Sequence, residues 1–158
     1  MNKQALHTQI INRLQAELVA LTAAALATHA EATDEENKAE YKYDTRGLEA
    51  SYLAMGQSRA AEEAAQSVAQ FTALSLRDFA PAEPVSLGAL VILEDNARSY
   101  YFIGPRAGGT EIEHEGQTIM VITPQSPLGR QLMGRKQGDA LQLDLGGKRS
   151  EQLVARVS

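Results

Sequence analysis

The acidic stretch TDEENKAEY, residues 33–41, lies between two long alanine-rich runs, and the fold of the first half of the chain follows from that position. Both runs carry apolar residues at alternating spacings of three and four, which is typical of helices that pack along one side. The first run covers residues 3–32 and the second covers residues 34–77. A short connection forces two such helices to be antiparallel neighbours. The sequence therefore predicts a helical hairpin with the acidic stretch at its tip.

The predicted seam of this hairpin consists of the regularly spaced apolar residues of each run. In the first run these are Ile11, Leu14, Leu18, Leu21 and Ala25. In the second run they form two sets, namely Leu48, Tyr52 and Met55, and then Ala61, Ala64, Val68 and Phe71. The two sets are out of phase with each other, so we expect a kink or stutter near Gly56.

The composition changes at FAPAEP, residues 79–84, where two prolines end the helix. Beyond this segment the apolar period becomes two, which indicates strands separated by glycine-containing turns. The predicted strands cover residues 89–93, 99–103, 118–123, 141–145 and 152–157. A short helix is expected between the third and fourth of these strands, with Ser126 as its N-cap, Pro127 as its first residue and Gly134 as its stop.

These patterns predict an α+β fold. Residues 1–79 form an antiparallel coiled-coil hairpin, residues 80–84 form a linker, and residues 85–158 form a small antiparallel β domain with one short helix. Apolar residues make up 44% of the chain, which is enough for a core, whereas 5% aromatic residues and no tryptophan suit a hairpin packed on alanine and leucine.

Composition also excludes several classes of function. Without cysteine the chain has no disulfide, thiolate zinc site or cysteine nucleophile, and its three histidines lack the spacing of metal ligands. The net charge of −5 argues against a free-standing nucleic-acid binder. We find no apolar signal core at the amino terminus and no run that approaches a membrane span, so we expect a cytoplasmic protein without membrane contact.

The run SPLGRQLMGRKQGD, residues 126–139, resembles the carboxy-terminal domain of the Gre-type (GreA/GreB) bacterial transcript cleavage factors. Residues 85–91, VSLGALV, are similar to the opening strand of that domain, and the helical hairpin is similar to the coiled coil of the family. The resemblance implies an FKBP-like domain that docks on RNA polymerase at the rim of the secondary channel. It assigns partner binding to the first residues of the run, Ser126, Pro127 and Leu128.

The same resemblance implies that the coiled coil enters the channel, where tip carboxylates help to hold the second catalytic Mg²⁺ that cleaves backtracked RNA. The candidates for this catalytic role are Asp34, Glu35 and Glu36. Asp34 and Glu36 are the candidate ligands of an Mg²⁺ shared with the polymerase, and the protein alone is expected to bind no cofactor. The partners implied are RNA polymerase and, indirectly, nascent RNA, with no independent DNA binding and with the protein as a monomer.

One departure from the family leaves two functions open. When the chain is aligned on Ala39-Glu40-Tyr41, Asn37 stands where Gre-type tips have their second carboxylate. The first function is stimulation of transcript cleavage. The second is regulation by binding in the secondary channel without stimulating cleavage. In both cases the protein is not itself an enzyme, and at most it activates the intrinsic nuclease activity of the polymerase.

Three other interpretations of the sequence concern the acidic stretch, His114 and a candidate enzyme activity. Thr33-x-x-Glu36 has the form of a capping box, in which the acidic residues stabilise the first turn of a helix and need no metal. His114, within the segment EIEHE, is expected on a solvated strand or loop rather than at a metal. A prolyl isomerase would need a deep aromatic pocket, which is hard to build from Tyr100, Tyr101 and Phe102 because consecutive residues of a strand alternate between its faces.

Overall fold

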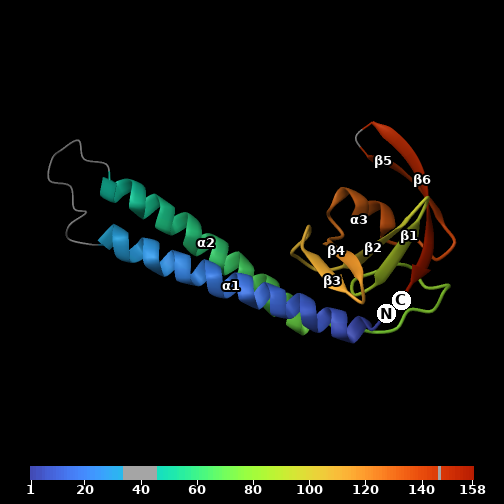
Figure 1. Ribbon diagram of the computed structural model, residues 1–158, viewed down its shortest axis with the longest axis horizontal. Helices are drawn as coiled ribbons and strands as arrows, with labels where there is room; N and C mark the ends of the chain where they lie inside the picture. The colour runs from blue at the N-terminus through green and yellow to red at the C-terminus, as the bar shows by residue number, and fades with distance from the viewer. Residues whose placement is uncertain (34–45, 146) are drawn as a thin grey trace. The chain divides into compact units, whose positions relative to one another are not determined.

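The structure is a computed structural model that describes residues 1–33, 46–145 and 147–158 (Figure 1). Its helices are α1 (Lys3–Thr33), α2 (Arg46–Ala73) and α3 (Pro127–Leu132). Its strands are β1 (Leu90–Glu94), β2 (Arg98–Ile103), β3 (Glu111–His114), β4 (Gln117–Ile122), β5 (Ala140–Leu145) and β6 (Lys148–Val157). Two helices thus precede a small β domain with one short helix, which confirms the predicted fold class.

The chain divides into two compact units. The hairpin unit consists of residues 11–69, and the sheet unit consists of residues 1–10 together with residues 70–158. The first turns of α1 and the last turn of α2 therefore belong with the sheet, although most of each helix belongs to the hairpin unit.

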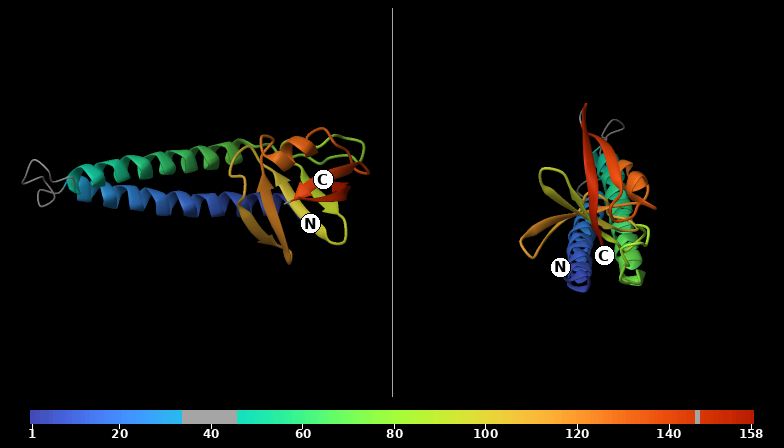
Figure 2. Two further views of the ribbon diagram at one scale, coloured as in Figure 1. Left: turned by 90° about the horizontal axis from the view of Figure 1, so that it is seen from above. Right: turned by 90° about the vertical axis from the view of Figure 1, so that its right-hand side faces the viewer.

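In the hairpin unit α1 and α2 lie side by side and antiparallel, as the views agree (Figures 1 and 2). The predicted seam of α1 is confirmed, because Leu14 and Ala25 are buried and the intervening seam residues are partly buried. On α2 the inward positions are Ala54, which is buried, and a regular series of half-buried residues, Gln57, Ala61, Ala64 and Val68.

The seam prediction is wrong for the first part of α2. Leu48, Tyr52 and Met55 are 56%, 65% and 68% exposed. The spacing of inward residues continues without a change of phase through Ala54 and Gln57, so the stutter predicted near Gly56 is wrong as well. This pattern was not recognised in the sequence because one of its inward residues, Gln57, is polar. Its Oε1 accepts a hydrogen bond of 2.7 Å from the hydroxyl of Thr28, which satisfies a polar group at an inward position.

By length and composition alone, residues Lys3–Glu31 of α1 would suffice to cross a membrane. The core helices of soluble proteins meet the same criterion, as do signal sequences near an amino terminus. The criterion is therefore weak evidence for a membrane segment, and the expectation of no membrane contact stays a prediction.

Helix α2 ends at Ala73, four residues before the predicted end at Arg77. The carbonyl oxygen of Phe71 bonds to the Nε2 of His7 at 2.8 Å and also accepts from the amide of Leu74 at 3.1 Å. In a continuing α-helix this oxygen would accept a hydrogen bond from the amide four residues later in the chain. His7 and Leu74 engage it instead. The contact between two helix ends, which sequence periodicity does not reveal, explains the early stop.

The sheet has six strands in the order β3-β4-β2-β1-β6-β5. Its neighbouring strands are antiparallel with the exception of β2 and β4, which pair in parallel. The predicted all-antiparallel sheet is wrong at this pair, because strand β3 was not included in the prediction. β3 pairs with β4 through a tight turn at Glu115 and Gly116, whose φ angles of 51° and 76° are those of a type I′ hairpin. β4 therefore runs in the direction of β2.

The two faces of the sheet pack against different elements. Along β2, Tyr101 and Ile103 belong to the core that includes Leu132 of α3. Phe102 points to the opposite face, where its ring stacks on that of Phe71 with 6.3 Å between centroids. His7 lies against both rings, with centroid distances of 6.3 and 6.4 Å. The ends of α1 and α2 thus cover one face of the sheet, and α3 covers the other.

Gly104 permits this close approach, and its replacement by alanine tests the packing. A Cβ at residue 104 would lie 2.5 Å from Cζ of Phe71 and 2.9 Å from Cγ1 of Val121. Because Phe71 is fully buried and cannot move aside freely, we expect Gly104→Ala to lower the free energy of unfolding by about 1–3 kcal/mol. Urea denaturation monitored by circular dichroism measures this change.

Gly108→Ala is the matched control, since a Cβ at that residue finds its nearest neighbour at 3.4 Å, in Thr123. That substitution should change the free energy of unfolding by less than about 0.5 kcal/mol. Equal effects of the two substitutions would show that the contact with Phe71 does not constrain residue 104.

Candidate functional site

The candidate tip carboxylates Asp34, Glu35 and Glu36 lie outside the described residues, as does Asn37. Their roles in catalysis and in Mg²⁺ binding therefore stay predictions. Thr33, the first residue of the proposed capping box, is the last residue of α1, and its hydroxyl donates to the carbonyl oxygen of His29 at 3.1 Å. Among the described residues there is no group of three or more His, Cys, Asp or Glu that could hold a metal.

The three candidate partner-binding residues form the start of α3. Ser126 is the N-cap, as predicted, with extended backbone angles, and Pro127 begins the helix. The Ser126 hydroxyl oxygen accepts from the amide of Gly129 at 3.0 Å and donates to the carbonyl of Thr123 at 2.8 Å. Both hydrogen-bonding functions of this hydroxyl are therefore engaged within the turn, so Ser126 positions the helix and is not available as a nucleophile.

Close packing fixes the direction of α3. A Cβ at Gly129 would lie 1.8 Å from the carbonyl oxygen of Thr123, so only glycine allows the first turn to approach this loop. At the other end, the amide of Gly134 donates to the carbonyl of Val85 at 3.0 Å. Leu132 is fully buried between these two attachments. The helix is held at both ends and in the middle.

Beside α3 lies a hollow of about 720 Å³. Its walls come from β2, β4, β5, the loop after β2 and α3 itself. The apolar side chains in the lining are Tyr101, Met120, Ile122, Pro127, Leu128 and Leu143. The polar side chains in the lining are Thr123, Ser126, Gln131 and Asp144. The three residues assigned to partner binding from the sequence are thus brought together on one wall of an open, mainly apolar hollow.

This lining suits binding better than chemical catalysis. Among the described residues of the hollow, Asp144 is the only one with an ionisable carboxylate, and its Oδ1 accepts from the amide of Gly147 at 3.0 Å. The other titratable side chain in the lining is the phenol of Tyr101, and no histidine, lysine or cysteine that could act as a base is among the described lining residues. The hollow can instead desolvate an apolar side chain of a partner, as ligand pockets lined by hydrophobic residues do.

The sequence analysis missed the strand residues of the hollow, chiefly Tyr101, Met120 and Leu143. The signal was present in their alternation, because each lies two residues from a buried member of the core on the same strand, for example Ile103 for Tyr101. Strand pairing across the sheet, with Tyr101 beside Met120, then brings them together. That register could not be read from the sequence without β3.

A second polar cluster lies at the turn between β3 and β4. His114 is 6% exposed, so the expectation of a solvated histidine is wrong; the alternation of β3 turns both Ile112 and His114 inward. Its Nδ1 lies 2.7 Å from Oε1 of Gln9, and its Nε2 lies 3.4 Å from Oε1 of Glu115 without hydrogen-bond geometry. Glu115 also accepts from the amide of Asn2 at 2.9 Å. This cluster fastens the start of α1 to the sheet.

The solved structures that are similar to this chain include the following three. The transcription factor Gfh1 is 24% identical, with 93% of this chain and 92% of that chain covered and a TM-score of 0.41. GreA factor homolog 1 (Gfh1) of Thermus thermophilus is 20% identical, with 98% and 93% covered and a TM-score of 0.39. Gfh1 of Thermus aquaticus is 22% identical, with 92% of each chain covered and a TM-score of 0.41.

No family model matches the chain. No curated protein matches it either.

Removal of the N-cap tests the role assigned to Ser126. In Ser126→Ala the amide of Gly129 loses its acceptor, and we expect the free energy of unfolding to fall by about 1 kcal/mol. Ser126→Asp retains a hydrogen-bond acceptor at the N-cap, so its free energy of unfolding should fall by less. Thermal unfolding monitored by circular dichroism compares the two variants, and an equal loss in both would contradict the capping role.

The turn cluster predicts a dependence of stability on pH. The hydrogen bond from the amide of Asn2 is the main cause that lowers the pKa of Glu115 below its ordinary value of 4.5. The ionised carboxylate therefore stabilises the folded state above pH 4.5, and this contribution is lost as the pH falls through the lower, folded-state pKa. We expect Glu115→Gln to lower the melting temperature near neutral pH, and the difference from the native protein to shrink towards about pH 3.

Glu111→Gln, on strand β3 before this turn, is the control, because the Glu111 carboxylate has no hydrogen-bond partner among the described residues. Melting curves of the native protein, Glu115→Gln and Glu111→Gln over this pH range measure the differences in melting temperature. A difference for Glu115→Gln that stays constant with pH would contradict the linkage.

Proposed function

We propose that this protein is an accessory factor of RNA polymerase, which binds at the rim of the secondary channel and stimulates cleavage of backtracked transcripts. The observation that carries the proposal is the position of Pro127 and Leu128. These residues lie near the start of the run that resembles the Gre-type factors, and they line an apolar hollow in which Pro127 is exposed and Leu128 is partly buried. A surface of this kind is typical of a site that an apolar group of a partner fills.

In this proposal the sheet unit provides the docking surface. Tyr101, Met120 and Leu143 form the floor, and α3, held by Ser126 and Gly129, forms a rigid wall. Burial of an apolar partner side chain between them removes both surfaces from water, and one fully buried leucine-sized group contributes about 1.5–3 kcal/mol. The rigid backbone keeps the entropic cost of ordering the site low.

The hairpin supplies the second part of the function. The acidic stretch lies in the sequence between the end of α1 at Thr33 and the start of α2 at Arg46. Asp34, Glu35 and Glu36 are the carboxylates that we propose to act in the channel, with Asp34 and Glu36 as ligands of Mg²⁺ shared with the polymerase. When bound, a second Mg²⁺ stabilises the attacking and leaving oxygens of phosphodiester hydrolysis.

Asn37 favours a second candidate function. An amide at the position of the second family carboxylate lowers the charge available to a cation. A factor that docks and occupies the channel without stimulating cleavage fits that substitution. The two functions share the docking surface and differ in what the acidic stretch does.

In both functions we propose that the protein has no catalytic activity of its own. It acts as a cytoplasmic monomer, contacts nascent RNA only within the polymerase complex and does not bind DNA independently. The prolyl isomerase interpretation would require an aromatic pocket, whereas Tyr101 is the only aromatic side chain among the described residues that line the hollow. An isomerisation assay on a proline-containing peptide that shows acceleration would contradict this part of the proposal.

The proposal is tested on stalled, backtracked elongation complexes. We expect the native protein to bind RNA polymerase and to accelerate Mg²⁺-dependent release of short RNA. Leu128→Gln should weaken binding by about tenfold or more, as expected when an apolar contact is lost, and should slow cleavage at limiting factor. Leu153→Gln is the matched control, because Leu153 is 45% exposed on β6 and does not line the hollow.

The acidic stretch is tested separately in the same assay. Asp34→Ala combined with Glu36→Ala should retain binding and abolish stimulation of cleavage. Glu62→Ala combined with Glu63→Ala, which removes two exposed carboxylates from α2, should retain both. Binding by the native protein without any cleavage would establish the second function, and absence of binding would refute both.

A further inference from the structure

A second hollow, of about 420 Å³, lies in the sheet unit where the start of α1 meets the segment after α2. Four charged side chains line it, namely Lys3, Arg77, Asp78 and Arg156. Three of the four are cations, although the chain as a whole carries a net charge of −5. Asp78 and the Glu83 carboxylate that pairs with Arg77 offset two of these charges, and the remaining positive charge in a concave site attracts anions.

We propose that the hollow lined by Lys3, Arg77 and Arg156 binds the phosphate group of a small phosphorylated ligand. None of these residues takes part in the polymerase function proposed above, and the two sites have no residue in common. The inference therefore stands independently of that function.

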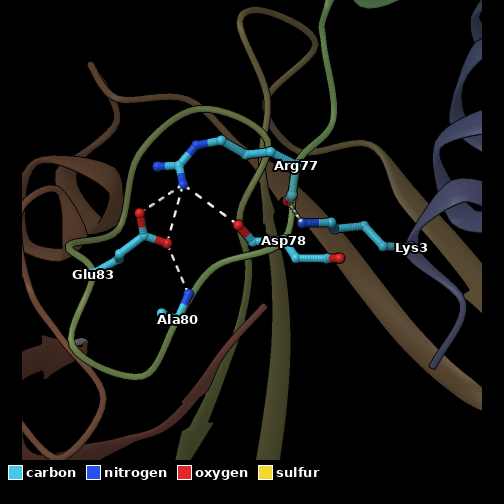
Figure 3. Close-up of polar contacts among 5 residues, drawn as sticks. All are labelled: Lys3, Arg77, Asp78, Ala80 and Glu83. Atoms are coloured by element: carbon cyan, nitrogen blue, oxygen red, sulfur yellow. Dashed lines mark hydrogen bonds and ion pairs between the residues drawn. The ribbon is translucent and has the colours of Figure 1, made fainter.

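Among the described residues, no carboxylate lies within ion-pair distance of the Lys3 ammonium group. Nζ donates to the carbonyl oxygen of Arg77, a neutral acceptor (Figure 3). It also lies 4.8 Å from the ring centroid of Phe79. Burial lowers the pKa of Lys3, against the opposing charge of Asp78. A cation that is partly removed from water without a bound counter-ion is costly, and an anion in the hollow would offset that cost.

Arg77 is held in place before any ligand binds. Its Nη1 donates to the two carboxylate oxygens of Glu83 at 3.0 and 3.1 Å (Figure 3). Its Cζ lies 4.0 Å from the ring centroid of Phe79. The amide of Ala80 in turn fixes Glu83 through a bond of 2.7 Å to Oε2. The planar guanidinium has five donors, so those that do not face Glu83 remain for an anion.

Arg156 provides the third cation from β6. Its side chain is exposed, and within the part of the chain that the structure describes its guanidinium forms no ion pair. Lysine and arginine together match a tetrahedral dianion, because arginine donates two parallel bonds and lysine supplies a compact charge. The volume exceeds that of one phosphate ion, so there is room for part of the organic group that carries it.

Titrations of the full-length protein by NMR test the site. Inorganic phosphate and adenosine monophosphate, each at constant ionic strength set with chloride, serve as probes. We expect both to shift the amide signals of Lys3, Gln4 and Asp78 in a saturable manner. The absence of saturable shifts with either probe would overturn the proposal.

Two variants of β6 locate the binding. Arg156→Gln should weaken binding at least about tenfold, the change expected when one charge-assisted hydrogen bond is lost. Arg149→Gln removes the same charge from the same strand outside the hollow and should leave the affinity within about twofold. Lys3→Gln should weaken binding as Arg156→Gln does. Equal weakening by Arg149→Gln and Arg156→Gln would overturn the site in favour of a general charge effect.

A single-stranded oligonucleotide distinguishes a small ligand from a nucleic acid. We expect its affinity per phosphate to be no greater than that of adenosine monophosphate, since one hollow accommodates one group. Binding of the oligonucleotide that Arg156→Gln abolishes, together with no saturable response to the small probes, would overturn the small-ligand assignment.

Discussion

The stacking of Phe71 on Phe102 joins the helices to the sheet, and much of the sheet unit is arranged around it. Phe71 lies in the last turn of α2 and is fully buried. Its carbonyl oxygen bonds to His7, which brings the first turns of α1 to the same place. Gly104 has no side chain, so the ring can approach the end of β2. The backbone and the ring of one residue therefore end a helix and cover a face of the sheet.

The opposite face shows how a surface hollow can persist next to a well-packed core. Leu132 enters the core from α3, while Pro127 and Leu128 at the other end of the helix line the hollow. Leu128 and Leu132 are four residues apart and share one face of α3; Leu132 is fully buried, whereas Leu128 is only partly buried against the same core. The contact of Gly129 with Thr123 fixes which end is inward. The hollow thus follows from how α3 is anchored and requires no distortion of the sheet.

Local patterns predicted most elements of this structure from the sequence. The N-cap at Ser126, the helix start at Pro127 and five strands depend on neighbouring residues, and the structure confirms them. β3 was missed because its residues Glu111 to His114 are mostly polar, and its pairing with β4 supplies much of its stability. Without β3, neither the parallel pairing of β2 with β4 nor the floor of the hollow could be predicted. Register is a property of two strands, and one strand alone does not specify it.

The same reasoning explains why the seam of α2 was misread. Apolar residues were assigned to the interior, yet Leu48, Tyr52 and Met55 are exposed while Gln57 is half-buried. Pattern analysis treats a polar residue as outward because burying it is costly. The hydroxyl of Thr28 removes that cost for Gln57, and this partner lies 29 residues away. Contacts of this kind determine which of two competing phases a helix adopts.

The described glutamates also bear on how an acidic stretch should be interpreted. Glu83 accepts from the amide of Ala80 and Glu115 accepts from the amide of Asn2, so each satisfies a backbone donor at a turn or helix start. A carboxylate next to free backbone amides is stabilised by them and needs no cation. Acidic residues between two helices are therefore weak evidence for a metal by their composition alone. What distinguishes Asp34 and Glu36 from capping residues is a loss of function on their removal that exceeds any loss of stability.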